Sequence, residues 1–325
     1  SSAVSLSVLL ATFMGGLCLG SIALPRVVSP RRHPLRVYAL IELGIGIFGI
    51  AILSGMPYLD HLYRTFAMQG FSGILLRAAV SAACLLPPTL LMGASLPAIA
   101  RWVEATPKGV AWLGFSYGGN IAGAVLGCLL AGFYLLRVHD VATATFAAAV
   151  VNIAVAIISF GLAAVAPHQP RSSDLVDPAA APATAAWPVF AAIALSGLSA
   201  LGAEVVWTRL LSLMLGPTVY TFSIILAVFL GGLGIGSGAG AYLSRRISRP
   251  RIALGWCQLL LTAAIAWTAY ALTRSLPFWQ ADLSSSGPWP KFLADIVRCI
   301  WAILPATCLW GASFPFALAA VARPG

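Results

Sequence analysis

Long apolar segments alternate with short polar ones along the whole chain. Each apolar segment runs for about 20 residues or more, a length that crosses the roughly 30 Å core of a bilayer as a helix. This pattern predicts an all-α, polytopic membrane helix bundle of about nine spans. We place these spans at residues 3–25, 36–57, 74–103, 110–136, 141–166, 187–213, 218–243, 251–275 and 292–322.

The composition supports this prediction and indicates which partners to expect around the chain. Apolar residues make up 60% of the chain and charged residues 9%, which leaves too little polar surface for a soluble fold of this size. The net charge of +10 comes largely from arginines in short loops between the spans. Because basic residues collect in the cytoplasmic loops of membrane proteins, we expect a lipid bilayer around this chain and no nucleic-acid partner.

Two arginine clusters orient the predicted spans. Arg26, Arg31, Arg32 and Arg36 follow the first span, and Arg245, Arg246, Arg249 and Arg251 follow the seventh. Both clusters are expected to lie in the cytoplasm. Alternation of the spans then places segment 167–188 on the same side.

Segment 167–188 also divides the chain. Its sequence, PHQPRSSDLVDPAAAPATAAWP, is rich in proline, alanine and serine and lacks a helical period, which is typical of a flexible linker. We therefore predict a first membrane repeat at 1–166, a cytoplasmic linker at 167–188 and a second membrane repeat at 189–325.

The two predicted repeats share sequence. With a shift of 216 positions, SLSVLLATFMGGLCLGS (5–21) aligns with TFSIILAVFLGGLGIGS (221–237), and with a shift of 218, PPTLLMGASLP (87–97) aligns with PATCLWGASFP (305–315). Shared glycine, proline and threonine positions indicate an internal duplication with both halves in the same orientation. The sixth span lacks a partner in the first half, and the fourth and fifth lack partners in the second. We therefore expect the sequence to be truncated at both ends.

Glu204 and Arg209 are two charged residues inside the otherwise apolar sixth span. A charge at the bilayer centre costs at least about 2.5–3.5 kcal/mol. Five residues turn a helix by about 500°, so the two side chains point about 140° apart and need other partners, unless Arg209 extends to the outer interface. Glu204 is either an intramembrane ligand- or proton-binding carboxylate or a residue that locks two helices together. Trp207 either stacks on a cation or lies at the membrane interface.

Three more polar residues are candidates for ligand binding or helix locking. Asn120 lies at membrane depth in the fourth span, and a residue of this kind more often bonds a neighbouring helix than a ligand. Glu42 in the second span aligns with Gln258 in the eighth under the shift of 216.

Small residues and prolines predict how the helices meet. Glycine stripes favour close helix packing, with a hinge for alternating access as the alternative. The stripes are Gly15, Gly16 and Gly20 in the first span, Gly119, Gly123 and Gly127 in the fourth, and Gly231, Gly232 and Gly236 in the seventh. Pro97 and Pro315 end the GASLP and GASFP motifs and predict kinks, because proline lacks an N–H donor. Such kinks either shape the helices or break them near a binding site.

Catalytic and metal-binding motifs are not found. The four histidines are scattered over predicted loops, and the six cysteines lie singly in apolar spans, so the spacing of a metal site is lacking. The sequence also lacks a phosphate-binding loop and a nucleophile elbow. We expect no catalytic residue, no metal and no cofactor in this chain.

Several motifs resemble the membrane region of bacterial spermidine synthase-like (polyamine aminopropyltransferase-like) proteins. They are EVVWTR (204–209), FLGGLGIGS (229–237), YGGNIAGAVLG (117–127) and the GASLP and GASFP pair. The resemblance covers most of the chain and extends distantly to the major facilitator superfamily. It implies a major-facilitator-like bundle in the bacterial inner (cytoplasmic) membrane. In that family the membrane domain is often fused to a soluble aminopropyltransferase-type domain.

The catalytic residues of that family do not carry over, because its glycine- and aspartate-rich adenosyl-cofactor loop is not found between residues 1 and 325. Our first hypothesis is a non-catalytic membrane module that anchors such an activity, or binds and passes its small ligand. One alternative is a structural or accessory subunit of a larger complex, with other membrane subunits or a fused soluble domain as partners. Another is a transporter of a small, polyamine-like molecule.

Overall fold

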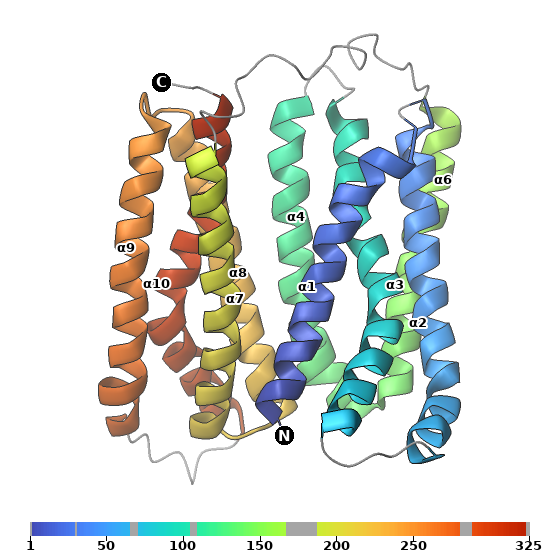
Figure 1. Cartoon of the computed structure of the whole chain (residues 1–325), viewed down its shortest axis with the longest axis horizontal. Helices are drawn as coiled ribbons and strands as arrows, with labels where there is room; N and C mark the ends of the chain where they lie inside the picture. Colours follow the sequence, from blue (N-terminus) through green and yellow to red (C-terminus); the bar gives the residue numbers. More distant parts are fainter. Residues whose placement is uncertain are drawn as a thin grey trace. The chain divides into compact units, whose positions relative to one another are not determined.

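The computed structural model describes residues 2–29, 31–65, 71–104, 109–166, 187–279 and 288–322. In this part of the chain all regular secondary structure is helical (Figure 1). The helices of the first half are α1 (Ser2–Val27), α2 (Pro34–Thr65), α3 (Phe71–Glu104), α4 (Gly109–Leu130), α5 (Leu136–Val138) and α6 (Val141–Val165). Those of the second half are α7 (Trp187–Leu215), α8 (Val219–Ser244), α9 (Pro250–Tyr270) and α10 (Pro288–Ala322). Short π-helical segments follow α4 (η1, Ala131–Leu135) and α9 (η4, Ala271–Ser275), and η5 (Leu276–Phe278) is a 3₁₀ turn.

Nine helices in the described ranges are long and apolar enough to cross a membrane. The predicted all-α class and the predicted spans are thus confirmed. Some helices extend beyond the predicted bounds. For example, α2 continues to Thr65, because backbone hydrogen bonding carries a helix past the end of its apolar stretch.

Side chains at two loops fix where helices begin. The Thr143 N–H donates to Asp140 Oδ1 over 2.8 Å at the start of α6, and the Thr221 N–H donates to Thr218 Oγ1 over 3.2 Å at the start of α8. Each bond satisfies a donor that the first helical turn leaves unpaired. The hydrogen bonds from Thr143 hold the pKa of Asp140, which lies outside the spans, below its ordinary value.

The turn between α7 and α8 uses a glycine. Gly216 has a φ of +102°, which residues with a side chain rarely adopt. Its N–H donates to the Ser212 carbonyl over 3.1 Å. This bond ends α7, and α8 begins three residues later at Val219.

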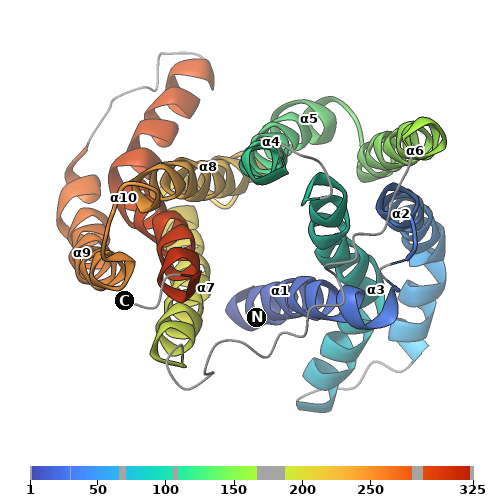
Figure 2. The ribbon, with the colours of Figure 1, turned by 90° about the horizontal axis from the view of Figure 1, so that it is seen from above.

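The chain forms two compact units. Unit 1 comprises Ser1–Leu113 and Val138–Val176, and unit 2 comprises Gly114–Arg137 and Asp177–Gly325. In unit 1, α1 packs on α3, and α2 packs on α3 and α6. In unit 2, α10 packs on α7, α8 and α9 (Figure 2).

Helix α4 packs with unit 2, although chain order placed residues 110–136 in the first repeat. The Cys128 thiol donates to the Ser223 carbonyl over 3.5 Å, and the ring centroids of Phe133 and Phe292 lie 5.0 Å apart. Ile121 of α4 lies against Gly234 of α8. Long-range packing of this kind, which chain order does not encode, assigns α4 to its unit.

Close helix crossings occur at matching places in both units. In unit 1, a Cβ added to Gly16 would overlap Thr89, and one added to Gly20 would overlap the Leu90 carbonyl. Gly93 lies equally close to the Leu17 carbonyl. These contacts bring α1 and α3 together backbone to backbone, as small residues allow.

The same contacts recur between α8 and α10 of unit 2. Gly232 lies against Thr307, and Gly236 lies against the Cys308 carbonyl. Gly311 lies against the Leu233 carbonyl. Each partner corresponds to its unit 1 counterpart under the shift of 216 or 218 residues, so the crossing is reproduced residue for residue.

Other glycines of the predicted stripes make no such approach. A Cβ at Gly15 or at its counterpart Gly231 would meet no described atom within 4 Å. The same holds for Gly119, Gly123 and Gly127, which are exposed. The α4 stripe therefore does not mediate close packing within unit 2, because the helix turns Ile121 and Cys128 toward α8 instead.

Pro97 and Pro315 lie inside helices, since α3 and α10 both continue through them. The predicted kinks at these prolines stay predictions. Both helices pack on neighbours, α10 on α7, α8 and α9, and α3 on α1 and α2.

Candidate functional site

Glu204 lies on the buried face of α7 with 7% of its surface exposed. Ser196, Trp207, Thr208 and Leu211 are buried on the same helix. Helix α7 packs on α8 and α10. Glu204 thus lies on the side of α7 that carries the other buried residues of this helix.

An aromatic cluster begins one turn away from Glu204. The ring centroids of Trp207 and Trp310 lie 5.4 Å apart, and those of Phe229 and Trp310 lie 6.1 Å apart. The Trp310 Nε1 donates to Ser199 Oγ over 3.2 Å, which fixes the ring between α10 and α7. Trp207 is buried in this cluster.

Within the described ranges, Glu204 forms no ion pair or hydrogen bond with another residue. The ion pair of these ranges joins Arg298 to Asp295, with 3.1 Å between Nη1 and Oδ1. Arg209 is exposed, whereas Glu204 is buried. The two residues thus lie on different sides of α7, as their spacing predicts. A buried carboxylate must be offset by a proton, a cation or several donors, and the described neighbours of Glu204 supply none of these.

The aligned candidates Glu42 and Gln258 have different partners. The Tyr38 hydroxyl hydrogen-bonds to Glu42 within α2. Gln258 instead reaches from α9 to α10, where its Nε2 donates to Ser313 Oγ over 3.0 Å. Gln258 therefore links two helices by a hydrogen bond, whereas the bond to Glu42 stays within one helix.

Asn120 does not join these candidates. Its side chain is exposed on α4, on the same stretch as the open glycines. The structure therefore does not gather the predicted polar residues into one site, and Glu204 with its aromatic neighbours is the best-formed candidate.

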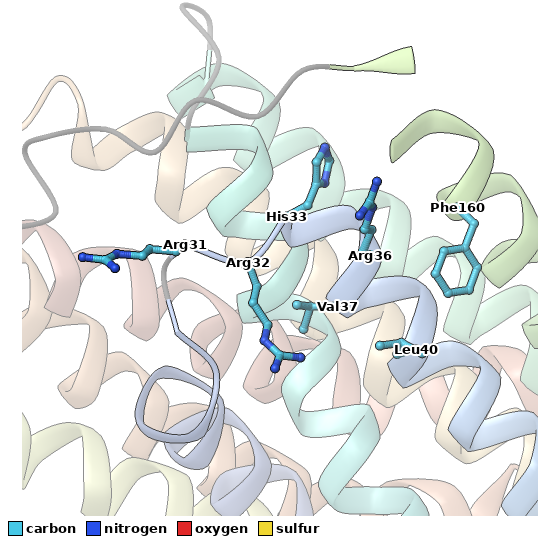
Figure 3. A pocket seen from close by; sticks show the side chains of 7 residues that line it. All are labelled: Arg31, Arg32, His33, Arg36, Val37, Leu40 and Phe160. Atoms are coloured by element: carbon cyan, nitrogen blue, oxygen red, sulfur yellow. The ribbon is translucent and has the colours of Figure 1, made fainter. Parts of the chain in front are cut away.

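The first arginine cluster, which orients the predicted spans, also borders a cavity of about 520 Å³ (Figure 3). It is lined by Arg31, Arg32, His33, Arg36, Val37, Leu40 and Phe160. Phe160 comes from α6, far along the chain. Spacing alone could not have predicted the cavity, although the density of arginines was a signal.

Among the described residues, no group of three or more His, Cys, Asp or Glu side chains is placed to hold a metal ion. All six cysteines are free. Cys257 and Cys299 are buried, whereas Cys18 is exposed.

This architecture defines a multi-pass helical membrane protein, one of whose two units holds a buried carboxyl group without a partner among the described residues. No family model matches the chain, and neither a curated protein nor a solved structure matches it. Its function must therefore be argued from its own residues.

Proposed function

We propose that this chain is a non-catalytic membrane module that binds a small organic cation at Glu204. The burial of Glu204 without a described basic partner carries the proposal. A cationic ligand would supply the missing counter-charge. The Trp207 and Trp310 rings nearby offer faces that attract ammonium groups, by about 2 kcal/mol or more when water is excluded.

The sequence resemblance suggests which cation would bind. Polyamines carry several ammonium groups on an apolar chain, which suits a carboxylate next to aromatic rings. The proposed module would anchor a spermidine synthase-like activity in the bacterial inner membrane, or bind and pass its ligand. Segment 167–188 would then be cytoplasmic.

The matching helix crossings support the proposal of two related halves. Gly16 with Thr89 and Gly232 with Thr307 are equivalent contacts, as expected of a duplicated, major-facilitator-like bundle. Parallel repeats of this type are common among transporters, and for this reason transport of a polyamine-like molecule is our second candidate function.

Equilibrium binding of spermidine to the full chain in phosphatidylcholine nanodiscs tests the proposal. Glu204→Gln removes the charge and keeps the shape, and should weaken binding at least about tenfold, the effect of losing one charge-assisted contact. Asp140→Asn is the matched control, because it removes an exposed carboxylate and should leave the affinity unchanged. Equal affinities for the wild type and Glu204→Gln would refute the cation site.

Uptake of labelled spermidine into proteoliposomes separates binding from transport. A transporter should accumulate spermidine and lose this activity in Glu204→Gln while the protein still elutes as a folded species. Binding without uptake would favour the anchoring or ligand-passing module.

The accessory-subunit alternative has one observation in its favour. Gly119, Gly123 and Gly127 form a stripe with no described atom close to it, and such a stripe accepts another helix. Co-purification of fixed partners at constant ratio after gentle extraction would support this alternative. A lone chain would count against it.

A further inference from the structure

The cavity of about 520 Å³ next to the α1–α2 loop has one basic side and one apolar side (Figure 3). Arg31 and Arg32 extend from the loop, and Arg36 extends from the first turn of α2. His33 is fixed beside them, because its Nε2 lies 2.9 Å from the Ala166 carbonyl oxygen at the end of α6. The loop and two helices thus hold the cavity together within unit 1.

The basic side lacks counter-charges from the described residues. None of the described carboxylates forms an ion pair with Arg31, Arg32 or Arg36, whose side chains are exposed. Of the described acids on or next to the helices that line the cavity, Glu42 bonds to Tyr38, and Asp140 caps the opposite end of α6 from Phe160. Three arginines line this cavity with their guanidinium groups pointing in different directions (Figure 3), and their positive charge favours an anion.

The apolar side consists of Val37 and Leu40 from α2 and Phe160 from α6. Leu40 is 56% exposed and Phe160 is 39% exposed. Both residues belong to membrane-spanning helices, so this side of the cavity continues into the lipid-facing surface. A ligand that fills the cavity would combine an anionic group with an apolar tail.

We propose that this cavity binds a phosphate group, with the arginines as donors and the apolar part of the ligand on Leu40 and Phe160. Guanidinium groups match phosphate with paired, charge-assisted hydrogen bonds. The phosphate is carried either by an acidic phospholipid or by a soluble molecule. The apolar side favours the phospholipid, because basic residues at the membrane surface attract such headgroups. The site lies in unit 1 and is independent of the cation site at Glu204.

The chain offers a matched control for this site. The second arginine cluster follows α8 and aligns with the first, but its Arg246 lies over the Tyr242 ring, with Cζ 4.5 Å from the ring centroid. Arg245→Gln with Arg249→Gln removes the same charge as Arg32→Gln with Arg36→Gln. A comparison of the two double variants separates a defined site from general surface charge.

Native mass spectrometry of the full chain in a neutral detergent tests the proposal, with added dioleoyl phosphatidylglycerol or dioleoyl phosphatidylcholine as probe. The wild type should retain phosphatidylglycerol in preference to phosphatidylcholine. Arg32→Gln with Arg36→Gln should weaken this retention at least about tenfold, and the control variant should change it less than about twofold. Equal retention of both lipids, or equal loss in both double variants, would overturn the site.

Two further measurements identify the source of the phosphate and test the site in a variant that keeps the positive charge. Inorganic phosphate at millimolar concentration should not displace the lipid. Displacement would still support a phosphate site but would assign it to a soluble ligand. Arg36→Lys keeps the charge and loses the paired hydrogen bonds, so a folded Arg36→Lys protein should bind phosphatidylglycerol several-fold more weakly than the wild type. Unchanged binding in this variant would contradict the proposed contacts.

Discussion

The helix pairs α1–α3 and α8–α10 cross in the same way but have different surroundings. In both pairs a glycine faces a threonine, and the next glycine faces a carbonyl group. Thr89 donates to the Leu85 carbonyl over 2.7 Å, and Thr307 donates to the Ile303 carbonyl over 3.2 Å. The threonine hydroxyls thus satisfy their own helices and do not hold the crossing together, which depends on backbone proximity.

The side chains around these two crossings differ. Trp310 in unit 2 is 5% exposed and packs on Trp207 and Phe229, whereas the aligned residue in unit 1, Met92, is 39% exposed. The aromatic cluster next to Glu204 therefore belongs to unit 2. Backbone contacts therefore restrict which residues fit at a crossing, whereas the residues around it can differ between the two units.

The largest expected effect on stability comes from adding a methyl group where two helix backbones cross. Gly20→Ala and Gly236→Ala each place a methyl group onto a backbone carbonyl of the facing helix, which cannot rotate away. Each substitution should lower the free energy of unfolding by about 3 kcal/mol. Titration with SDS in mixed micelles, followed by circular dichroism, measures the loss. A large loss of stability in one variant and none in the other would show that the crossings α1–α3 and α8–α10 are not equivalent.

Gly15→Ala and Gly231→Ala are the controls for these variants. Both positions are open, and alanine favours a helix over glycine by about 1 kcal/mol. The controls should leave the stability unchanged or raise it slightly. Losses as large as those at Gly20 and Gly236 would show that any added methyl group disturbs these helices.

An effect of intermediate size on stability should distinguish alanine substitutions at the aligned serines Ser95 and Ser313. Ser313 accepts a hydrogen bond from Gln258 of α9, whereas Ser95 donates to the Met92 carbonyl of its own helix over 2.7 Å. Ser313→Ala should therefore cost about 1 kcal/mol of unfolding free energy and Ser95→Ala clearly less. The same SDS titration compares them. Equal losses would mean that the bond to Gln258 contributes nothing to stability.

The smallest effect concerns the helix caps Asp140 and Thr218, since only the first can ionise. Hydrogen bonds from Thr143 lower the pKa of Asp140 in the folded protein. Its stabilising contribution is therefore complete above the ordinary Asp pKa of about 4 and is lost as the pH falls through the lower folded value. Thr218 should cap α8 at every pH.

Thermal unfolding of the wild type and Asp140→Asn between pH 7 and pH 3 measures this difference. Asparagine also caps helices but does not titrate in this range. The gap between the two proteins should therefore shrink in acid. A gap that stays constant with pH would contradict the ionised cap.

Much of the fold could be predicted from the sequence, because crossing a bilayer is a local requirement on length and polarity. The ends of helices were less predictable. Residues 58–65 look like a polar loop, yet they continue α2. Hydrogen bonding within a helix does not stop where the apolar residues stop.

The candidate sites were predictable only in part. Glu204 stands out because a charge inside an apolar span is costly, but Trp310, which packs on Trp207, lies on α10 and leaves no such local signal. The loop arginines were visible, whereas Phe160 of α6 became part of their cavity only through packing. Partners far apart in sequence leave no local pattern.

The sequence by itself determined that this is a multi-pass helical membrane protein, where its spans lie, and which positions repeat between its halves. Each of these properties depends on residues close together in the chain. Only the tertiary structure decided that Gly20 and Gly236 meet a facing helix while Gly123 does not, and that α4 packs with unit 2. Every glycine permits close approach, but the approach itself depends on the helix that packs against it, and packing is a property of the whole chain.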